Sequence, residues 1–221
     1  MKKIITVTLI TGFILATSGC ATNVNVNDGS HMGNIDTIFG GVNVGENAKV
    51  GNISSINGGV DIESGALALK VDTVNGGIEI GNNVTITSAV TVNGNIEAGN
   101  ALQVNGRLET VNGGVNLKSQ TNVTGNIVTV NGDIDVDNTV IHKNIKTVNG
   151  NIILTNESIL KGDLTVESSN GWSLGMSYDE ITITIDATSR VEGTIHLHRP
   201  VILEIADRSN VNEIEEHYNQ K

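Results

Sequence analysis

The chain has 221 residues, with 24 acidic and 13 basic side chains, a net charge of −11 and only 2% aromatic residues. Nucleic-acid binding and electrostatic docking on anionic lipid both need a basic face, so this charge balance argues against both. A compact domain of this size usually packs more aromatic residues. A solenoid does not need them, because each coil buries its aliphatic residues against the next coil.

Residues 1–19 have the features of an export signal. Lys2 and Lys3 supply the positive start, and an apolar stretch runs from Ile4 to Ala16. At roughly 13 residues, this stretch is too short to remain as a membrane-spanning helix. We therefore predict that residues 1–19 are a signal peptide and that the protein is exported.

The end of this segment, Ala16-Thr17-Ser18-Gly19-Cys20, resembles the lipobox of bacterial lipoproteins, with Thr17 where that family usually has Leu. The resemblance implies that Cys20 becomes the mature N-terminus and is lipidated on its sulfur and its amine. Several acyl chains hold a protein firmly in a membrane, where one chain is marginal. Ala21 follows where Asp would indicate inner-membrane retention, so the resemblance implies the outer membrane in a Gram-negative host. The alternative is an unmodified cysteine within an ordinary cleaved signal.

Residues 20–36 connect this cysteine to the repeats. They are rich in Asn, Asp, Ser and Gly, and we expect a flexible tether that begins with the lipidated Cys20. Since Cys20 is the only cysteine, an internal disulfide is excluded.

A regular repeat occupies residues 37–172. Large apolar residues recur every six positions, and a second apolar set follows four residues after the first, a spacing that fits neither a helix nor a single strand. The period fits a short strand and a corner, three of which make one coil. The six-residue row, with one extra residue before Val111 and another before Val130, includes Ile38, Val44, Val50, Ile56, Ile62, Ala68, Val74, Ile80, Ile86, Val92, Ala98, Val104, Val111, Leu117, Val123, Val130, Val136, His142, Val148, Leu154, Leu160, Val166 and Trp172.

We therefore predict an all-β fold: a single-stranded, three-sided parallel β-helix, or solenoid, of about eight or nine coils of 18–19 residues. Stacked at ~4.8 Å, these coils would make a rod of roughly 40 Å. An Asn-Gly pair marks every third corner, and stacked asparagine amides can both donate and accept hydrogen bonds. The resulting structural ladder would comprise Asn57, Asn75, Asn93, Asn112, Asn131 and Asn149.

The pattern slips after Trp172 and resumes with Ile185, Val191, Leu197 and Leu203. We predict that residues 173–221 form irregular last coils and a C-terminal cap, because an open solenoid end exposes a sheet edge. The candidates for this cover are Trp172, Tyr178 and the tail from Ser209 to Lys221.

Several phrases of the repeat resemble known families. VNGNIEA, VTGNIVTV, VNGDIDV and LKGDLTV resemble bactofilin coils, whereas VDTVNGGIEI and KTVNGNIIL resemble an adhesin-type β-strand-repeat family of bacterial envelope proteins. The resemblance covers residues 38–166 and favours a right-handed coil. Bactofilins polymerise end to end in the cytoplasm, and the export signal departs from that pattern. The adhesin resemblance implies a surface role without naming a ligand.

Few residues suggest chemistry. Asp133, Asp135 and Asp137 alternate on one predicted strand, as catalytic acids of a polysaccharide lyase could, but a lyase needs a base and a charge neutraliser together. We interpret these aspartates as a solvated outer face. His196 and His198 could bind a metal, but without a third ligand nearby in sequence we interpret them as surface residues. We predict no catalytic, cofactor-binding or metal site and no cofactor.

These patterns favour a non-catalytic, membrane-anchored β-helix lipoprotein of the bacterial cell envelope, with a scaffold or adhesin-like binding role. Its expected partners are the membrane, through the lipid, and an envelope polysaccharide or another envelope protein; self-association is a further option. The alternative is a carbohydrate-binding or carbohydrate-active β-helix of the lyase or hydrolase type. A groove that gathers three or more carboxylates with Lys or Arg on one face would favour the carbohydrate-active enzyme, whereas evenly spread ladders would favour the scaffold.

Overall fold

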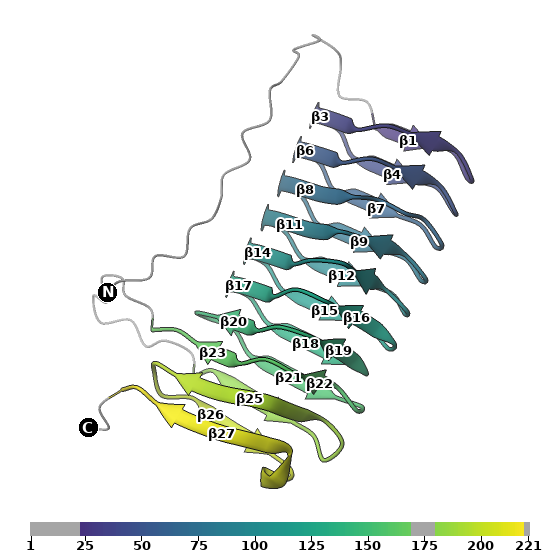
Figure 1. Ribbon diagram of the computed structural model, residues 1–221. Helices are drawn as coiled ribbons and strands as arrows, with labels where there is room; N and C mark the ends of the chain where they lie inside the picture. Colours follow the sequence, from purple (N-terminus) through teal and green to yellow (C-terminus); the bar gives the residue numbers. More distant parts are fainter. Residues whose placement is uncertain (1–22, 169–179, 219–221) are drawn as a thin grey trace, which may run out of the picture.

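The computed structural model describes residues 23–168 and 180–218, and these form one stack of parallel strands (Figure 1). Side one of the stack is a 10-stranded sheet, so the described residues make ten coils. Its strands are β1 (Val24–Val26), β4 (Val42–Val44), β7 (Val60–Ile62), β9 (Ile78–Ile80), β12 (Ile96–Ala98), β15 (Val115–Leu117), β18 (Ile134–Asp137), β21 (Ile152–Thr155), β24 (Thr182–Ile185) and β26 (Ile202–Ile205).

Side two carries shorter strands, and isolated bridges through Leu67 join β5 to β10. Its strands are β2 (His31–Met32), β5 (Lys49–Val50), β10 (Thr85–Ile86), β13 (Gln103–Val104), β16 (Thr121–Val123), β19 (Thr139–Ile141), β22 (Ile159–Leu160) and the first part of β25 (Arg190–Leu197).

Side three continues through the second part of β25. Its other strands are β3 (Ile35–Phe39), β6 (Ile53–Asn57), β8 (Lys70–Asn75), β11 (Ser88–Asn93), β14 (Leu108–Asn112), β17 (Ile127–Asn131), β20 (Ile145–Thr147), β23 (Leu164–Val166) and β27 (Val211–Glu216). A short 3₁₀ helix, η1 (Arg208–Asn210), precedes β27.

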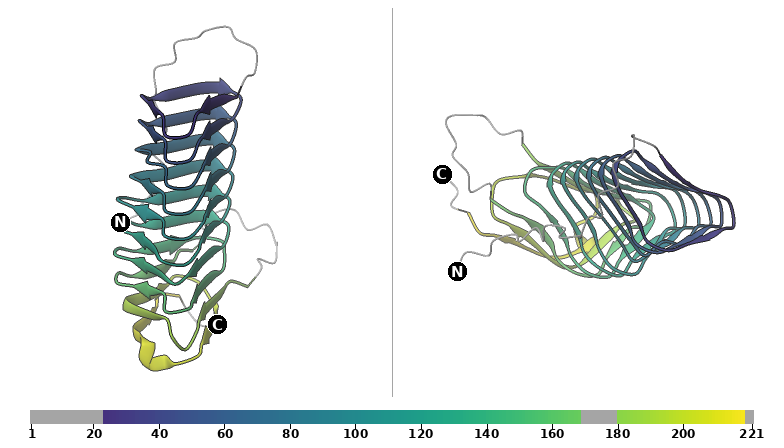
Figure 2. Two further views of the ribbon diagram at one scale, coloured as in Figure 1. Left: turned by 90° about the vertical axis from the view of Figure 1, so that its right-hand side faces the viewer. Right: turned by 90° about the horizontal axis from the view of Figure 1, so that it is seen from above.

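The predicted three-sided parallel β-helix is therefore confirmed, and Figure 2 shows its coils stacked along one axis. Equivalent residues lie 18 or 19 positions apart, as the repeat predicted. One coil is longer: Thr182 binds the side chain of Asn151, which is 31 residues earlier. Residues 169–179, which include the predicted cover residues Trp172 and Tyr178, lie outside the described part. The right-handed sense of the coil stays a prediction.

The coil count exceeds the expected eight or nine because the predicted tether is wrong from residue 23 onward. Strands β1, β2 and β3 build a first coil there, and Val26 and Ile35 are buried in it. The asparagines that suggested disorder cap its corners instead. Asn23 Oδ1 accepts from the Gly41 N–H at 2.9 Å, and Asn34 Oδ1 accepts from the Asn52 N–H at 2.9 Å. Backbone N–H groups at the corners of stacked coils need hydrogen-bond acceptors. The polar composition of this segment therefore supplies the asparagines that accept from these N–H groups.

Two of the three six-residue rows point inward as predicted. Ile80 and Ile86, for example, are 4% and 0% exposed, and they belong to one continuous aliphatic core. The third row does not point inward: Val74 is half-buried on the outer surface of side three, and Thr73 is buried in its place. The same holds for the equivalent residues Ile38, Ile56, Val92, Val111, Val130 and Val148, none of which is buried, whereas Val166, a later member of this row, is buried as predicted.

In four coils the reason is a hydrogen bond from a threonine hydroxyl to a corner carbonyl of side three, whereas the buried hydroxyls of Ser55 and Thr147 have no partner. The hydroxyl of Thr73 donates to the Gly58 carbonyl at 3.0 Å, and Thr110 donates to Gly94 at the same distance. A corner carbonyl that faces the interior needs a donor, and valine has none to offer. The buried hydroxyl residues at this position are Ser55, Thr73, Thr91, Thr110, Thr129 and Thr147.

The corner between sides one and two carries a residue with a left-handed backbone in successive coils. Asn and Gly occupy most of these positions, since they accept this backbone at little steric cost. Ala101, Gln120 and Glu157 are exceptions, at φ 58°, 63° and 68°. The left-handed residues at this corner are Gly29, Asn47, Gly65, Asn83, Ala101, Gln120, Asn138, Asn156 and Glu157.

The C-terminal tail takes the form of a last coil. Its strand β27 pairs in parallel with β25, and its Val211 is buried at 3% exposure. Ile214 and Tyr218 pack against the core from the same segment. Residues 209–218 thus extend the sheet, and residues 219–221 lie outside the described part.

Candidate functional site

Outward side chains form straight rows, because equivalent residues of successive coils pair in register. The first row is the asparagine ladder at the corner between sides three and one. Each Nδ2 donates to the Oδ1 of the asparagine one coil earlier, at 2.9 Å in every step from Asn57 to Asn149. All six predicted ladder residues thus form one chain of amide hydrogen bonds.

Different groups end this ladder. Asn57 donates to the Ile38 carbonyl at 3.3 Å, because Phe39 occupies the ladder position in the coil before it. At the other end, Arg199 Nη1 donates to Asn149 Oδ1 at 2.9 Å. An asparagine amide has two donor hydrogens, and the ladder uses one. The ladder therefore presents a further donor once per coil along the rod.

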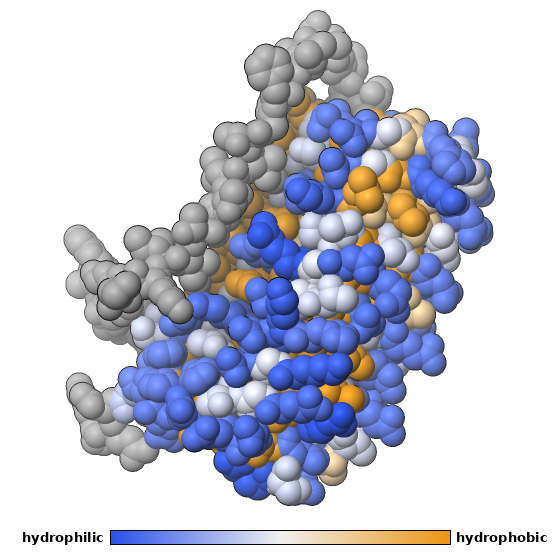
Figure 3. Space-filling view, in the orientation of Figure 1, coloured by the Kyte–Doolittle hydropathy of each residue, from blue (hydrophilic) through white to orange (hydrophobic). Residues whose placement is uncertain are grey.

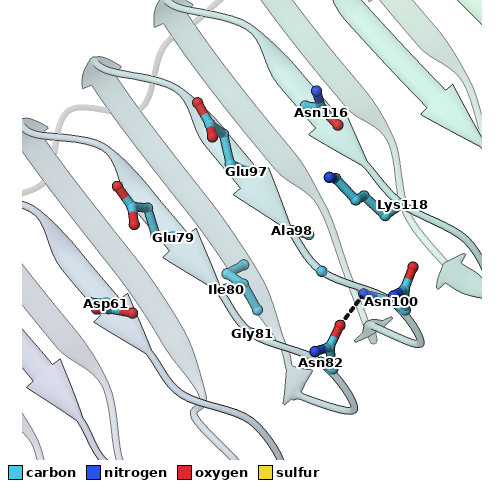
Figure 4. A pocket seen from close by; sticks show the side chains of 11 residues that line it. Asp61, Glu79, Ile80, Gly81, Asn82, Glu97, Ala98, Asn100, Asn116 and Lys118 are labelled. Atoms are coloured by element: carbon cyan, nitrogen blue, oxygen red, sulfur yellow. Dashed lines mark hydrogen bonds between the residues drawn. The ribbon is translucent and has the colours of Figure 1, made fainter.

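The second row is acidic and lies on the outer surface of side one. Asp61, Glu79 and Glu97 take equivalent positions on β7, β9 and β12, and Asn116 follows on β15. They line a shallow groove together with Lys118, as Figure 4 shows. We call these five residues the acidic groove. Asn82 and Asn100 border it at the next corner, where Asn82 Oδ1 accepts from the Asn100 N–H at 2.8 Å.

The groove suits binding better than acid–base chemistry. Its three carboxylates are all exposed and occupy the same strand position, spaced at the ~4.8 Å of neighbouring strands. A pair of catalytic carboxylates needs two different environments that push their pKa values apart. Like charges in a row repel one another, so a ligand with hydroxyl donors or positive charge would relieve this repulsion. Lys118 adds one cation to the lining.

The aspartates of β18 and its borders form the outer face that the sequence predicted, since Ile134 and Val136 between them are buried. Asp133 accepts from the Asn151 N–H at 2.7 Å, and Asp137 accepts from Asn156 Nδ2 at 2.9 Å. Burial and then the neighbouring Asp137 and Asp133 raise the pKa of Asp135. Asp133 and Asp137 therefore accept hydrogen bonds from residues of the next coil, at the corners on either side of β18.

The outer surface of side three carries a cluster of charged residues that the sequence analysis did not identify. Burial raises the pKa of Asp72, while Lys70 and Arg107 act against this effect and Glu109 adds to it. Arg107 also forms an ion pair with Glu109, with Nε 3.1 Å from Oε2. Asp72 of β8 and Glu109 of β14 lie in one outer row with Val90 of β11 between them, and only knowledge of the strand register brings these groups together.

The histidines divide into two groups. His142, which the six-residue count placed inward, is exposed, and Ile141 is buried in its place. Its Nε2 lies 2.9 Å from Asn122 Oδ1. His196 of β25, in contrast, lies beside Glu215 and His217 of the last coil, and the sequence prediction missed both of these partners.

Figure 3 shows one face of the rod, on which polar side chains dominate and apolar residues form small groups between them. Within residues 23–168 and 180–218, no helix is long and apolar enough to cross a membrane. Cys20, the predicted lipid-attachment residue, lies outside the described part. Comparisons of the chain with protein-family models, with curated proteins and with solved structures gave no match.

Proposed function

We propose that this protein is a non-catalytic, lipid-anchored rod of the bacterial cell envelope that serves as a scaffold or an adhesin-like binding surface. The observation that carries this proposal is the even spacing of outward polar rows along ten stacked coils. The asparagine ladder and the acidic groove each repeat one side chain per coil, a spacing that suits an extended or repetitive partner. An envelope polysaccharide or another envelope protein would be such a partner.

The buried polar groups support a non-catalytic role. In the part of the chain that the structure describes, every buried polar side chain is a serine or threonine hydroxyl. Catalytic acids, bases and nucleophiles usually have pKa values shifted by burial or by a specific charge partner. The carboxylates of the acidic groove are instead exposed and alike.

The first coil changes the expected geometry of the anchor. Val24, the first residue of β1, lies four positions after Cys20, with only residues 21–23 between them. A fully extended chain of that length spans at most about 14 Å. A lipid on Cys20 would therefore hold the first coil close to the membrane surface. Ten coils at ~4.8 Å give the rod a length of about 45 Å.

Radiolabelled fatty acid supplied to cells that produce the protein tests the anchor. We expect label in the wild-type protein and none in the Cys20→Ala variant. Wild-type protein should stay with membranes in high salt and dissolve in detergent, because acyl chains bind through apolar burial. An unlabelled wild-type protein in the soluble fraction would refute the anchor.

The acidic groove supports a second candidate function, carbohydrate binding. It gathers three carboxylates and Lys118 on one face, and carboxylates can accept hydrogen bonds from sugar hydroxyls. A glycan array probed with the exported form tests this function. The double variant Glu79→Gln/Glu97→Gln should lose at least about tenfold in affinity, or 1.4 kcal/mol. Glu46→Gln, at an exposed corner outside the groove, should bind as the wild type does.

If the wild-type protein binds no glycan, the carbohydrate function is wrong while the anchored-rod proposal stands. Equal binding by the wild-type protein and the double variant would place the sugar elsewhere on the rod.

A further inference from the structure

Two histidines and one glutamate converge at the C-terminal end of the rod. His196 lies on the outer surface of side three in β25, and Glu215 is its register partner on β27. His217 follows two residues after Glu215, at the end of the same segment. No short sequence motif connects His196 with Glu215 and His217, because the pairing of β25 with β27 brings it beside them.

Their donor atoms form a nearly equilateral triangle. His196 Nδ1 lies 3.1 Å from Glu215 Oε2, and His217 Nε2 lies 3.2 Å from the same oxygen. The two imidazole nitrogens lie 3.3 Å apart. Zinc binds histidine nitrogen and carboxylate oxygen at 2.0–2.2 Å, so two ligand atoms of a tetrahedral zinc ion lie about 3.4 Å apart. The three atoms are therefore already close to the spacing of zinc ligands.

Hydrogen bonding alone satisfies this triangle poorly. If both imidazoles donate to Glu215 Oε2, their two N–H groups also face one another at 3.3 Å. If one imidazole turns its lone pair to the carboxylate, two acceptors face each other instead. A cation replaces the protons and accepts a lone pair from all three atoms, since metal ligands must be deprotonated.

Neighbouring groups hold the ligands in place. The ring of His198 stacks on the ring of His217, with centroids 4.7 Å apart and an interplanar angle of 18°. The His217 N–H donates to the Leu197 carbonyl at 2.7 Å and fixes the backbone beside β25. Groups that orient ligands in this way contribute to metal affinity.

We infer that His196, Glu215 and His217 form a binding site for a divalent transition-metal ion, zinc by its donor set. Two imidazoles and one carboxylate suit zinc, whereas magnesium and calcium prefer oxygen ligands. Three protein ligands leave the fourth tetrahedral position to water. The ion would link the last strand, β27, to β25 and so secure the free edge of the solenoid. This inference is independent of the lipid anchor and of the acidic groove.

Isothermal titration of zinc into the full chain in detergent tests the site. The Cys20→Ala background removes the only thiol as a competing ligand. We expect one zinc ion per chain and a loss of affinity of at least about tenfold in His217→Ala and in Glu215→Gln. His142→Ala, which removes an exposed histidine outside the site, should bind zinc as the background does. Magnesium should give no binding.

Hydrogen exchange supplies a second measurement that does not depend on the heat signal. Zinc should slow the exchange of the β27 amides in the background protein and leave them unchanged in Glu215→Gln. The absence of one-to-one binding would overturn the inference. Binding of equal strength in the background, His217→Ala and Glu215→Gln would overturn it as well.

Discussion

The hydroxyl of Thr91 donates to the carbonyl oxygen of Gly76 at 2.9 Å, at the corner that closes the preceding coil. The same bond recurs at Thr73, Thr110 and Thr129, which donate to Gly58, Gly94 and Gly113. Thr147 is also buried at this position, but its hydroxyl has no hydrogen-bond partner. One repeat position thus holds both a bonded and an unbonded hydroxyl.

Thr91→Val should lower the free energy of unfolding by about 1 kcal/mol, because it leaves the Gly76 carbonyl without this donor. Thr147→Val is the matched control, and it should be neutral or stabilising because it removes an unpaired buried hydroxyl. Valine fits there, since Val166 takes the equivalent place in the next coil. Urea denaturation of both variants measures the difference. Equal losses would show that packing, and not the hydrogen bond, selects threonine.

The ladder offers a second comparison. Asn93→Ala removes the bond to Asn75 and the bond from Asn112, both at 2.9 Å. We expect a loss of about 1–2 kcal/mol, since each exposed bond contributes modestly. Asn116→Ala removes an exposed amide from side one that makes no ladder bond, and its effect should stay within about 0.5 kcal/mol. If the two variants unfold at the same urea concentration, the ladder adds nothing to stability.

Glycine at the corner beside the ladder is required by the close approach of two coils. A Cβ on Gly94 would lie 2.2 Å from the Gly76 carbonyl oxygen, whereas a Cβ on Gly77 would lie 3.4 Å from its nearest atom. Gly94→Ala should therefore destabilise the rod by at least about 2 kcal/mol through overpacking. Gly77→Ala should cost less than about 1 kcal/mol. Thermal unfolding of the two variants tests the contrast, and the reverse order would contradict the stacking geometry.

Asp186 should make stability depend on pH in the acidic range. Burial opposes its ionisation, but hydrogen bonds from the Asn156 N–H, from Ser189 and from the Thr188 N–H outweigh burial and lower its pKa to about 2. A carboxyl with a lowered pKa stabilises the fold above its unfolded pKa of 3.8, and this contribution disappears as the pH falls through about 2. Because Asp186 is partly exposed to solvent, we expect its ionised carboxylate to contribute about 1 kcal/mol to the free energy of unfolding.

Asp186→Asn should thus be less stable than the wild type at pH 7, and the gap should close between pH 4 and pH 2. A difference between Asp186→Asn and the wild type that stays constant from pH 7 to pH 2 would contradict the role of the ionised carboxylate.

The sequence was sufficient for the coil, since the apolar period and the Asn-Gly corners are local signals that repeat. It could not decide which of two adjacent residues, such as Thr73 and Val74, faces the interior. Apolarity favours valine, but the Gly58 carbonyl needs the threonine hydroxyl. The first coil escaped prediction for a related reason, because its corner asparagines resemble the composition of a disordered linker.

The histidine cluster was out of reach of local patterns. His196 was visible as a candidate ligand, but Glu215 and His217 belong to a tail whose pairing with β25 depends on the register of the last coil. The acidic groove likewise depends on register, because Asp61, Glu79 and Glu97 become neighbours only when the strands stack. Sites on this rod are properties of the stack and not of any single repeat.

Mass spectrometry of the intact protein extracted from membranes tests the anchored-rod account most directly. The account predicts a chain that begins at Cys20, lacks residues 1–19 and carries the mass of several acyl chains. A chain that is cleaved at another position, or that carries an unmodified Cys20, would contradict it.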